Sequence, residues 1–551
     1  MAETQVAQAA PAAGEPAAAD ANGVDAVPAL PQSGTQRGSG LSRRTLVQGL
    51  IGSLLIVIGA FGAGGTLVHD PVLSDSPLGV IRYGHGQDLA TILVYLGVAL
   101  LVWAWVRLGR DVLANKVRAR GVLIAATAWI APMIISPPQF TRDPFSYLGQ
   151  GELALRGLDP YVLGPGVLGD AIAQNVHPFW EWTPAPYGPL FILVAKLIVA
   201  GTGEHLILGV IAMRLTMMIG LVLLVASLPG LVRHLGGKLP MAFWLVFANP
   251  LMVVHLVGGP HNDLLMIGFL ASGVLMTLSR RHIVGIALVT VAAAIKASAL
   301  VALPFLVWVW AARMPGKPLR RFVQACAASI GVFAVVFGGA MLASGQDLGW
   351  IGAMQAPTMI SNWVNLPTGL GELMHGFVQM FGPLPEAPFV TMMRDAADVA
   401  VLVVLAVQWW KARHGGVEAV RRAGITLLVT AILAPPTLPW YLSWGLVILC
   451  AVPWHRRMAA ITAGLTVVAM LVYYPNGEAA MYSWSHMAWV LLAAVLVLVS
   501  MYRPDPLHLG LRRRKDAGSA TTPSRATAAV ETVPSSKDDP RRPSDLDPEP
   551  V

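Results

Sequence analysis

The sequence predicts an all-α polytopic membrane protein, and three observations support this fold class. First, only 12% of the 551 residues are charged, whereas 55% are hydrophobic. A soluble domain carries roughly 25% charged residues, so most of this surface must face something other than water. Second, apolar runs recur near the ~20-residue length that a helix needs to cross a bilayer. Third, the sequence lacks the alternation over about 10 residues that a membrane barrel requires.

The two ends of the chain differ in composition from its middle. Residues 1–43 are rich in Ala, Pro and Gly, and residues 504–551 in Ser, Thr, Pro and mixed charge. Neither segment can bury enough apolar surface to offset its chain entropy. We therefore expect two disordered cytoplasmic tails around a transmembrane domain at 44–503. Arg43-Arg44 imitates a twin-arginine signal, but the long apolar run behind it indicates a membrane anchor.

The basic residues indicate which connections lie in the cytoplasm. The net charge is +8, and Lys and Arg gather in short clusters between apolar runs. This pattern is typical of the positive-inside bias rather than of nucleic-acid binding. The first three spans are expected at 46–68, 88–107 and 121–136. Their second connection is strongly basic, so the long loop 137–186 is expected outside the cytoplasm.

Later spans alternate regularly around basic connections, with a second large outer loop at 343–393. They are expected near 262–278, 283–297, 298–312, 322–342, 394–410, 424–435, 440–453, 457–473 and 485–502.

The stretch 187–257 does not fit simple alternation. It holds three apolar runs, at about 187–201, 206–230 and 240–257. Three crossings would place His261 in the cytoplasm, against the charges on both flanks. We therefore expect one run to be re-entrant or a half-helix, which is tolerated where it lines a cavity. The total is about 14 membrane-spanning helices, within roughly 12 to 15, and both termini are expected in the cytoplasm of a bacterial inner membrane.

The first outer loop contains the leading candidate for catalysis. Asp143 precedes a proline, a pattern typical of a helix start. Its carboxylate is expected to cap that helix, to act as a base at the mouth of a membrane cavity, or to do both. Phe145, Leu148 and Leu155 then form an apolar stripe, which predicts a helix lying along the membrane surface. Gly157 occupies the position of a C-cap.

Two aromatic segments are candidates for binding an acceptor. Trp180-Glu181-Trp182 combines aromatic rings with a carboxylate, which suits the apolar faces and hydroxyl edges of sugars. The same residues also suit an interfacial aromatic belt, and the sequence leaves both interpretations open. The second large outer loop adds a polar and aromatic patch, made of Asn362, Trp363 and Asn365.

Ionisable residues inside or at the edge of spans are rare and suggest functional sites. His261-Asn262-Asp263 begins an apolar helix, either as a capped start or as polar groups facing a substrate phosphate or hydroxyl. Lys296 ends another apolar span. It either extends its ammonium group to the lipid headgroups or neutralises a lipid phosphate as a point charge. The same two interpretations apply to Arg214.

Neither cysteine suggests a metal or redox site. Cys326 and Cys450 both lie inside apolar runs, as small buried hydrophobic residues do. No Cys/His metal spacing is present. No cofactor is therefore expected, although the sequence does not rule out a divalent metal.

Several motifs between about 140 and 370 together resemble one family. They are Arg142-Asp143-x-x-Ser146-Tyr147, Gly157-Leu158-Asp159-Pro160-Tyr161, Thr183-Pro184-Ala185-Pro186-Tyr187-Gly188-Pro189, Asn249-Pro250-Leu251, Gly258-Gly259-Pro260-His261-Asn262-Asp263, Lys296-Ala297-Ser298-Ala299-Leu300 and Trp363-x-x-Leu366-Pro367-Thr368-Gly369. With them the chain resembles the polyprenyl-phosphate-mannose-dependent α-(1→6)-mannopyranosyltransferases of actinobacterial cell envelopes, in the GT-C membrane superfamily. Beyond 370 the resemblance rests on the span pattern alone.

The resemblance implies a GT-C fold with outer-face juxtamembrane helices and an acidic catalytic residue in the first outer loop, here Asp143. A second carboxylate is missing beside it, which weakens a metal-dependent version. It also implies a lipid-linked mannose donor and a lipomannan or lipoarabinomannan acceptor, with Tyr147 and Tyr187 in the substrate-binding motifs. Inversion needs a single base. Lys296, Arg214 or the helix start at His261 would stabilise the leaving phosphate.

Two alternatives stay open at this point. The residues do not distinguish donor sugars, so the chain is also compatible with a GT-C transferase that uses a polyprenyl-phosphate glucose or arabinofuranose. A lipid or sugar transporter is a further alternative. Transporters are often built from internal repeats, and the two halves of this chain show no convincing self-similarity.

Overall fold

The computed structural model describes residues 39–435 and 437–503, which fold almost entirely into helices. Across these two ranges the only β pairing is an isolated antiparallel bridge between Tyr473 and Ala479. The C-terminal tail predicted from composition and most of the N-terminal one lie outside the described residues.

Every apolar run predicted from the sequence is helical. The first half contains α1 (Arg43–Ala63), α2 (Gly84–Leu113), α3 (Ala119–Ile130), α4 (Asp143–Leu155), α5 (Pro178–Glu181), α6 (Pro189–Thr202), α7 (Leu206–Leu235), α8 (Leu239–Ala242), α9 (Asp263–Leu278) and α10 (His282–Ile295). The second half contains α11 (Leu303–Ala311), α12 (Pro318–Ser344), α13 (Trp350–Ala353), α14 (Leu366–Gln379), α15 (Ala387–Lys411), α16 (Gly416–Leu433), α17 (Leu442–Leu449), α18 (Arg456–Leu471) and α19 (Trp484–Ser500).

Length and composition make the protein a polytopic membrane protein. Within the described ranges, the four helices α1, α2, α7 and α12 are each long and apolar enough to cross a bilayer, and a bent helix pair makes a fifth candidate. The remaining apolar helices are shorter or less apolar than these. The larger number of spans expected from the sequence therefore stays a prediction.

The bent pair occupies the third apolar run of the stretch 187–257. It joins Leu239–Phe247 to Met252–Gly258 at an angle of 55°. Both parts contain π-helical turns, and Pro250 stands between them. Proline cannot donate the backbone hydrogen bond that would continue the first part. The irregularity predicted for this stretch is thus a bend, and whether the chain re-enters the membrane there stays a prediction.

Arg214 on α7 holds the end of the bent pair in place. Its side chain is fully buried. The guanidinium donates to the carbonyl oxygens of Val257 at 3.0 Å, Gly258 at 2.8 Å and Ile134 at 2.7 Å. These hydrogen bonds pair buried carbonyl groups that the irregular backbone would otherwise leave without a donor.

The position of α4 corrects two expectations. The apolar stripe predicted a helix on the membrane surface, but Phe145 and Leu148 are 1% exposed and α4 packs chiefly against α6. These two residues of the stripe therefore contact protein, whereas the third, Leu155, is 41% exposed. Asp143 was expected to cap the helix with its side chain, and this is also wrong. Asp143 is the first helical residue, and its backbone N–H donates to the hydroxyl of Thr141 at 3.0 Å. Gly157 follows the helix with a φ of +75°, at the position expected for a C-cap.

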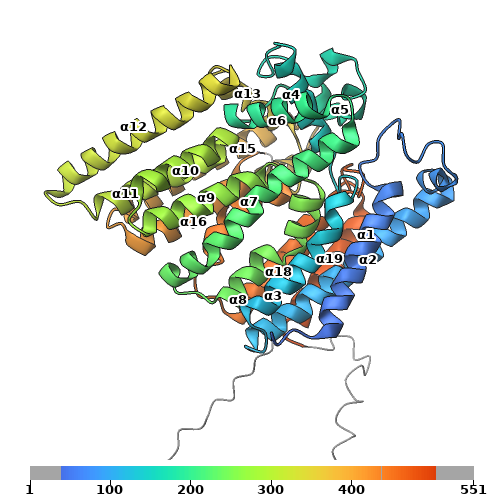
Figure 1. Ribbon diagram of the computed structural model, residues 1–551, viewed down its shortest axis with the longest axis horizontal. Coiled ribbons are helices and arrows are strands. Elements are labelled where there is room, and N and C mark those ends of the chain that lie inside the picture. The colour runs from blue at the N-terminus through green and yellow to red at the C-terminus, as the bar shows by residue number, and fades with distance from the viewer. Residues whose placement is uncertain (1–38, 436, 504–551) are drawn as a thin grey trace, which may run out of the picture.

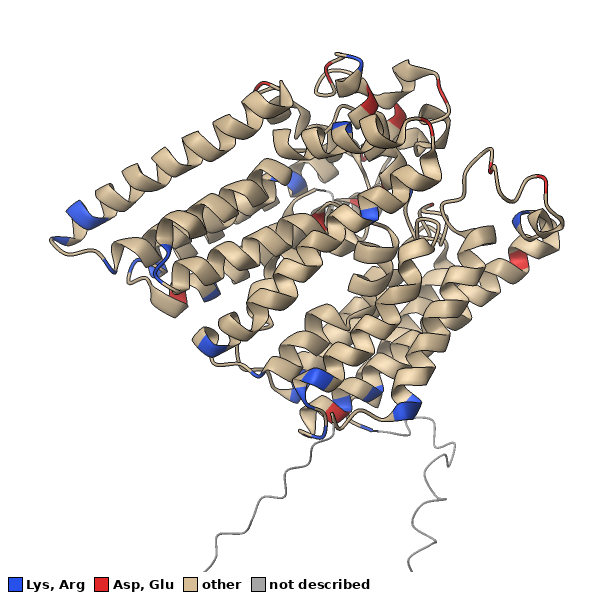
Figure 2. Ribbon diagram, viewed as in Figure 1, with Lys and Arg blue, Asp and Glu red and all other residues tan. Residues whose placement is uncertain are grey.

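The two ends of the helix bundle differ in charge. Figure 1 shows α4, α5, α6 and α13 at one end of the molecule and α3 and α8 at the other. Figure 2 shows most lysines and arginines at the lower ends of the helices, whereas most acidic residues lie at the upper end or in the interior. The loop that carries α4 and α5 therefore lies opposite the basic end.

Candidate active site

A cavity of about 180 Å³ lies beside the start of α4. The loop before α4, the helix α5, the segment 360–362, the segment before α17 and the turn 473–482 all contribute to its walls. The wall residues with the most informative side chains are Asp143, Trp180, Asn362, Trp440, Tyr473 and Glu478. Aromatic rings mixed with polar groups give such a cavity the lining that a sugar requires, since sugars present both apolar faces and hydroxyl groups.

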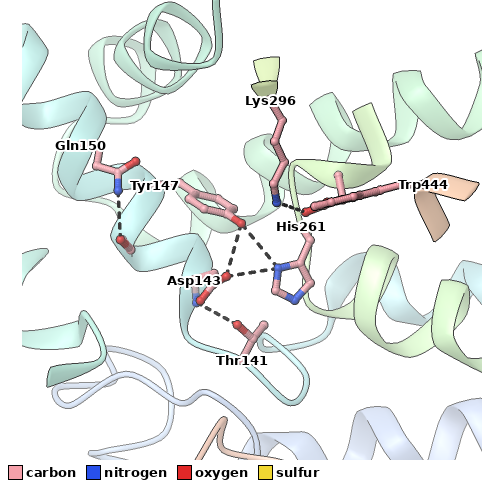
Figure 3. A network of polar contacts seen from close by, with 9 residues as sticks. Thr141, Asp143, Tyr147, Gln150, His261, Lys296 and Trp444 are labelled. Atoms are coloured by element: carbon pink, nitrogen blue, oxygen red, sulfur yellow. Dashed lines mark hydrogen bonds and ion pairs between the residues drawn. The ribbon is translucent and has the colours of Figure 1, made fainter. Parts of the chain in front are cut away.

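Asp143 is the carboxylate in this wall with the most specific surroundings. Its side chain is 12% exposed, and its Oδ2 lies 3.3 Å from Nδ1 of His261. The phenol of Tyr147, one helical turn later, donates to the same Oδ2 at 3.4 Å and lies 3.5 Å from the same Nδ1. Figure 3 shows the three side chains facing one another between α4 and the start of α9.

These surroundings keep Asp143 in its ionised form. Burial raises the pKa of its carboxyl, but the hydrogen bond and charge of His261, the Thr141 hydrogen bond and the positive charge of Lys296 lower it. The net effect places the pKa of Asp143 below its ordinary value. The carboxylate at the cavity wall is therefore available to accept a proton.

The two neighbouring phenols stay neutral. Burial, together with nearby carboxylates, raises the pKa values of Tyr147 and Tyr187 well above the usual range. The two rings meet edge to face, with centroids 5.4 Å apart. Both side chains can therefore donate hydrogen bonds but carry no charge.

A second polar cluster centres on Asp263, the first residue of α9. The ammonium of Lys296 contacts Asp263 Oδ2 at 2.7 Å, and the indole N–H of Trp444 donates to Oδ1 at 2.5 Å. Asp263 is fully buried and Lys296 nearly so. The ammonium also lies 4.5 Å from the ring centre of Tyr441 and 5.8 Å from that of Tyr187. The sequence predicted Lys296 and Asp263 separately, and the structure brings them together.

Trp440 connects the two clusters to the cavity. Its indole stacks on the imidazole of His261, with ring centres 3.5 Å apart and planes inclined by 19°. Trp440 lines the cavity, whereas His261 is fully buried behind it. Sequence reasoning missed both Trp440 and Trp444. The signal for them was the close aromatic spacing of Trp440, Tyr441 and Trp444 at the start of the span expected near 440–453.

The structure places only some of the acceptor candidates in the cavity wall. Trp180 and Asn362 line the cavity with Asp143, whereas Glu181 and the exposed Trp182 are not among its wall residues. Trp363 donates to the Met481 carbonyl at 2.9 Å.

Asn365 lies outside the cavity wall, and its side chain forms hydrogen bonds that hold the fold together. Its Oδ1 accepts from the backbone N–H of Thr368 at 3.1 Å and so caps α14. Its amide donates to Thr437 at 2.9 Å. Trp363 and Asn365 thus hold the segment at the start of α14 against the C-terminal part of the chain.

Two other candidate residues lie outside the cavity wall. Arg214 is bonded to backbone carbonyls, as described above. Asn262 is fully buried, and its amide has no hydrogen-bond partner within the described part of the chain. Glu152 on α4, another carboxylate near Asp143 in the sequence, forms an ion pair with Arg156 at 2.6 Å.

Comparisons with known proteins identify the family of the chain. The family model described as the N-terminal domain of α-(1→6)-mannopyranosyltransferase matches residues 46–312. The model described as the MptB C-terminal domain matches residues 367–503. An α-(1→6)-mannopyranosyltransferase A from Mycobacterium tuberculosis is 38% identical over 471 residues, which cover 84% of this chain and 90% of that protein. The chain belongs to the α-(1→6)-mannopyranosyltransferase family.

Other members of this family are similar over most of the chain. The α-(1→6)-mannopyranosyltransferase A of Corynebacterium glutamicum is 30% identical, covering 80% of this chain and 94% of that protein. The α-(1→6)-mannopyranosyltransferase B of the same organism is also 30% identical, covering 74% and 73%. No solved structure matches the chain. Family membership confirms the resemblance drawn from the motifs and extends it beyond residue 370.

Proposed function

We propose that the protein is an inverting mannosyltransferase that moves mannose from polyprenyl-phosphate-mannose to a mannan acceptor. The product is an α-(1→6) linkage in lipomannan or lipoarabinomannan, formed on the extracytoplasmic face of the bacterial inner membrane. The observation that supports this most directly is an ionised Asp143 in the wall of an aromatic cavity, in a membrane protein of this family.

The acceptor saccharide is assigned to the cavity. Trp180 and Trp440 offer apolar ring faces, and Asn362 offers an amide for hydroxyl groups. The acceptor hydroxyl would then lie beside Asp143, which removes its proton as the oxygen attacks the anomeric carbon. A positioned general base typically contributes 10²–10⁴-fold. Inversion in one displacement requires no second carboxylate, in agreement with the isolated position of Asp143 in its loop.

The donor phosphate is assigned to the start of α9 and to Lys296. An ammonium group has three donors, and Asp263 accepts from Lys296 at 2.7 Å, so further donors are available for a phosphate oxygen. The helix start at His261-Asn262-Asp263 adds the favourable field of backbone N–H groups. Tyr147 and Tyr187 border this region as neutral donors. Arg214 has no part in phosphate binding in this proposal, since backbone carbonyls occupy its guanidinium.

The test is a transfer assay on membranes that contain the protein. Radiolabelled polyprenyl-phosphate-mannose is supplied together with a synthetic α-mannoside acceptor. A labelled, lengthened product that an α-(1→6)-mannosidase degrades is the expected result. Label that enters vesicles without a new glycosidic bond would indicate transport instead. Transfer from polyprenyl-phosphate glucose or arabinofuranose, but not from the mannose donor, would indicate the other GT-C reaction.

A further inference from the structure

The wall of the cavity beside α4 holds a second carboxylate, that of Glu478. It lines the same cavity as Asp143, but it comes from the turn between α18 and α19 rather than from the first outer loop. Its side chain is 57% exposed. Within the described residues 39–435 and 437–503 its carboxylate accepts no hydrogen bond. The carboxylate is therefore available to a molecule that enters the cavity.

The turn that carries Glu478 is fixed by its backbone. The N–H of Phe140 donates to the carbonyl of Pro475 at 2.9 Å. Gly477 has a φ of +95°, which favours glycine, and a Cβ there would lie 3.0 Å from the Cα of Thr141. The turn thus lies directly against the segment that leads into α4. Because the side chain of Glu478 forms none of these contacts, the turn does not depend on it.

His177, another wall residue, approaches Glu478 from the start of α5. Its Nδ1 accepts from the backbone N–H of Phe179 at 3.2 Å. This bond places the proton of the neutral ring on Nε2. Nε2 lies 3.7 Å from Oε1 of Glu478, which is longer than a hydrogen bond. The imidazole therefore presents a donor near the carboxylate without occupying it.

Arg142 provides a positive charge in the same wall. Its Nε donates to the backbone carbonyl of Asn175 at 3.0 Å, and its Nη2 to the side-chain oxygen of Asn175 at 3.4 Å. In the part of the chain that the structure describes, Nη1 makes no hydrogen bond. Burial lowers the pKa of Arg142, and the negative charge of Glu478 raises it. A guanidinium and a carboxylate with unused hydrogen-bonding capacity thus border one cavity.

This combination suits the hydroxyl groups of a sugar. A hydroxyl donates one hydrogen bond and accepts others through its lone pairs, so it needs partners of both kinds. With its C6 hydroxyl beside Asp143, an acceptor mannose still presents hydroxyls at C2, C3 and C4. The rings of Trp180 and Trp440 can cover its apolar faces but cannot distinguish these hydroxyls. Hydrogen bonds to charged groups are roughly twice as strong as neutral ones, so Glu478 and Arg142 are the wall residues best able to do so.

We infer that Glu478 binds one ring hydroxyl of the acceptor mannose, that Arg142 donates to a neighbouring hydroxyl oxygen, and that the two side chains select acceptors carrying these groups. This inference rests on the proposed transfer reaction and adds to it the residues that determine acceptor specificity. Asp143 takes the proton of the attacking hydroxyl, whereas Glu478 holds a hydroxyl that does not react. Glu478 therefore contributes to acceptor affinity and not to the chemical step.

The first experiment measures steady-state mannose transfer by Glu478→Gln. An interaction that is equally strong in the ground state and the transition state affects KM and leaves kcat unchanged. Loss of the charge should raise the KM for the acceptor roughly tenfold, with the KM for the lipid donor and the protein yield unchanged. An unchanged acceptor KM would overturn the inference. A fall in kcat at unchanged acceptor KM would also overturn it, because Glu478 would then act in the chemical step.

Asp88→Asn is the matched control for this variant. Asp88 on α2 is an exposed carboxylate that also lies 3.7 Å from a histidine nitrogen, that of His85. It is not a wall residue of the cavity. The substitution removes the same charge and leaves a similar amide, so it should change neither KM nor kcat. A rise in acceptor KM equal to that of Glu478→Gln would show a general charge effect and overturn the inference.

The second experiment identifies the bound hydroxyl. Wild type and Glu478→Ala are compared on a synthetic α-mannoside and on its 2-, 3- and 4-deoxy forms. The wild type should use one deoxy form roughly 10- to 100-fold less well in kcat/KM. Glu478→Ala should lose little more on that form, because both changes remove the same interaction.

Two outcomes separate this inference from the proposed function. Normal transfer by the wild type, with losses that are additive for all three deoxy acceptors, would overturn the inference alone. A wild-type protein that transfers no mannose to any of these acceptors would overturn the proposed function, and this inference with it.

Discussion

Asp143 combines an ionised carboxylate with a helix start that does not depend on its side chain. Its backbone N–H donates to Thr141, so replacing the carboxylate leaves that hydrogen bond in place. We therefore expect Asp143→Asn and Asp143→Ala to be produced at similar levels. Turnover of both should fall by 10²–10⁴-fold, or about 3–5 kcal/mol in the barrier at ~1.36 kcal/mol per tenfold. The measurement is mannose transfer per unit of purified protein.

A large difference in stability and turnover between the two variants would contradict the role of Asp143 as the base. If the alanine protein were unstable and the asparagine protein nearly normal in turnover, Asp143 would be a structural residue. The base would then be sought at Glu478, the other carboxylate in the cavity wall, ahead of Glu181 and Asp263, which lie outside that wall.

Lys296 is expected to affect donor binding and protein stability separately. Lys296→Ala should raise the apparent KM for the lipid donor more than the KM for the acceptor. It also leaves Asp263 buried without its cation, a change that costs about 3–5 kcal/mol when a buried pair loses one partner. The double variant Lys296→Met with Asp263→Asn removes both charges, so it should regain much of the protein yield without regaining donor affinity. An unchanged donor KM in both variants would remove Lys296 from the phosphate site.

The sequence predicts which residues of the site are polar, but not which of them pair. An acid in the first outer loop and a histidine at a helix start are both visible as exceptions in apolar surroundings. The contact between Asp143 and His261 depends on the packing of α4 against the start of α9, which no local pattern records. The same holds for Lys296, whose charge is directed to Asp263 rather than to lipid headgroups.

At the scale of elements, the position of α9 determines where Asp263 and the preceding His261 lie in the site. That position depends on the close packing of α9 against α7. A Cβ added at Gly268 would lie 2.2 Å from the backbone oxygen of Gly220, 2.5 Å from its Cα and 2.6 Å from its carbonyl carbon. Backbone cannot move aside as a flexible side chain can. Gly268→Ala should therefore cost about 1–3 kcal/mol, as overpacking typically does, and should shift His261 away from Asp143.

A glycine in an open position provides the control for this change. A Cβ at Gly331 on α12 meets nothing within 4 Å. Gly331→Ala should leave thermal stability unchanged or slightly higher, because alanine is the better helix former. The measurement is thermal unfolding in detergent, with transfer activity at a permissive temperature. Equal stability of the two variants would show that α7 and α9 have room to separate.

The positions of the helices could be predicted from the sequence better than the contacts that each helix makes. The apolar runs become helices because every backbone polar group in a membrane must be satisfied internally. The bend at Pro250 follows from the missing N–H of proline. The burial of α4 was not predictable, since an apolar stripe packs equally well against lipid and against protein. Only the neighbouring α6 decides between the two.

At the scale of the whole molecule, the site is assembled from both halves of the chain. The first half supplies Asp143, His261 and Lys296, and the second supplies Trp440 and Trp444. Reasoning from motifs concentrated on the first half, because its charged residues stand out. Trp440 and Trp444 fall at the start of a span expected near 440–453, where no charged residue marked a site. Their role depends on long-range packing of α17 against α9, which is a property of the complete fold.

The membrane orientation is the last prediction, and the whole site assignment depends on it. Basic residues gather at one end of the bundle and the α4–α5 loop lies at the other (Figure 2). Val162 in that loop is 67% exposed, and Asn115 lies exposed in the basic connection between α2 and α3. In a background with Cys326→Ser and Cys450→Ser, Val162→Cys should react with a membrane-impermeant thiol reagent on intact cells. Asn115→Cys should react only after the membrane is permeabilised. The reverse result would place Asp143 in the cytoplasm. The donor would then have to be recognised on the opposite leaflet, and the acceptor would be a glycan still facing the cytoplasm.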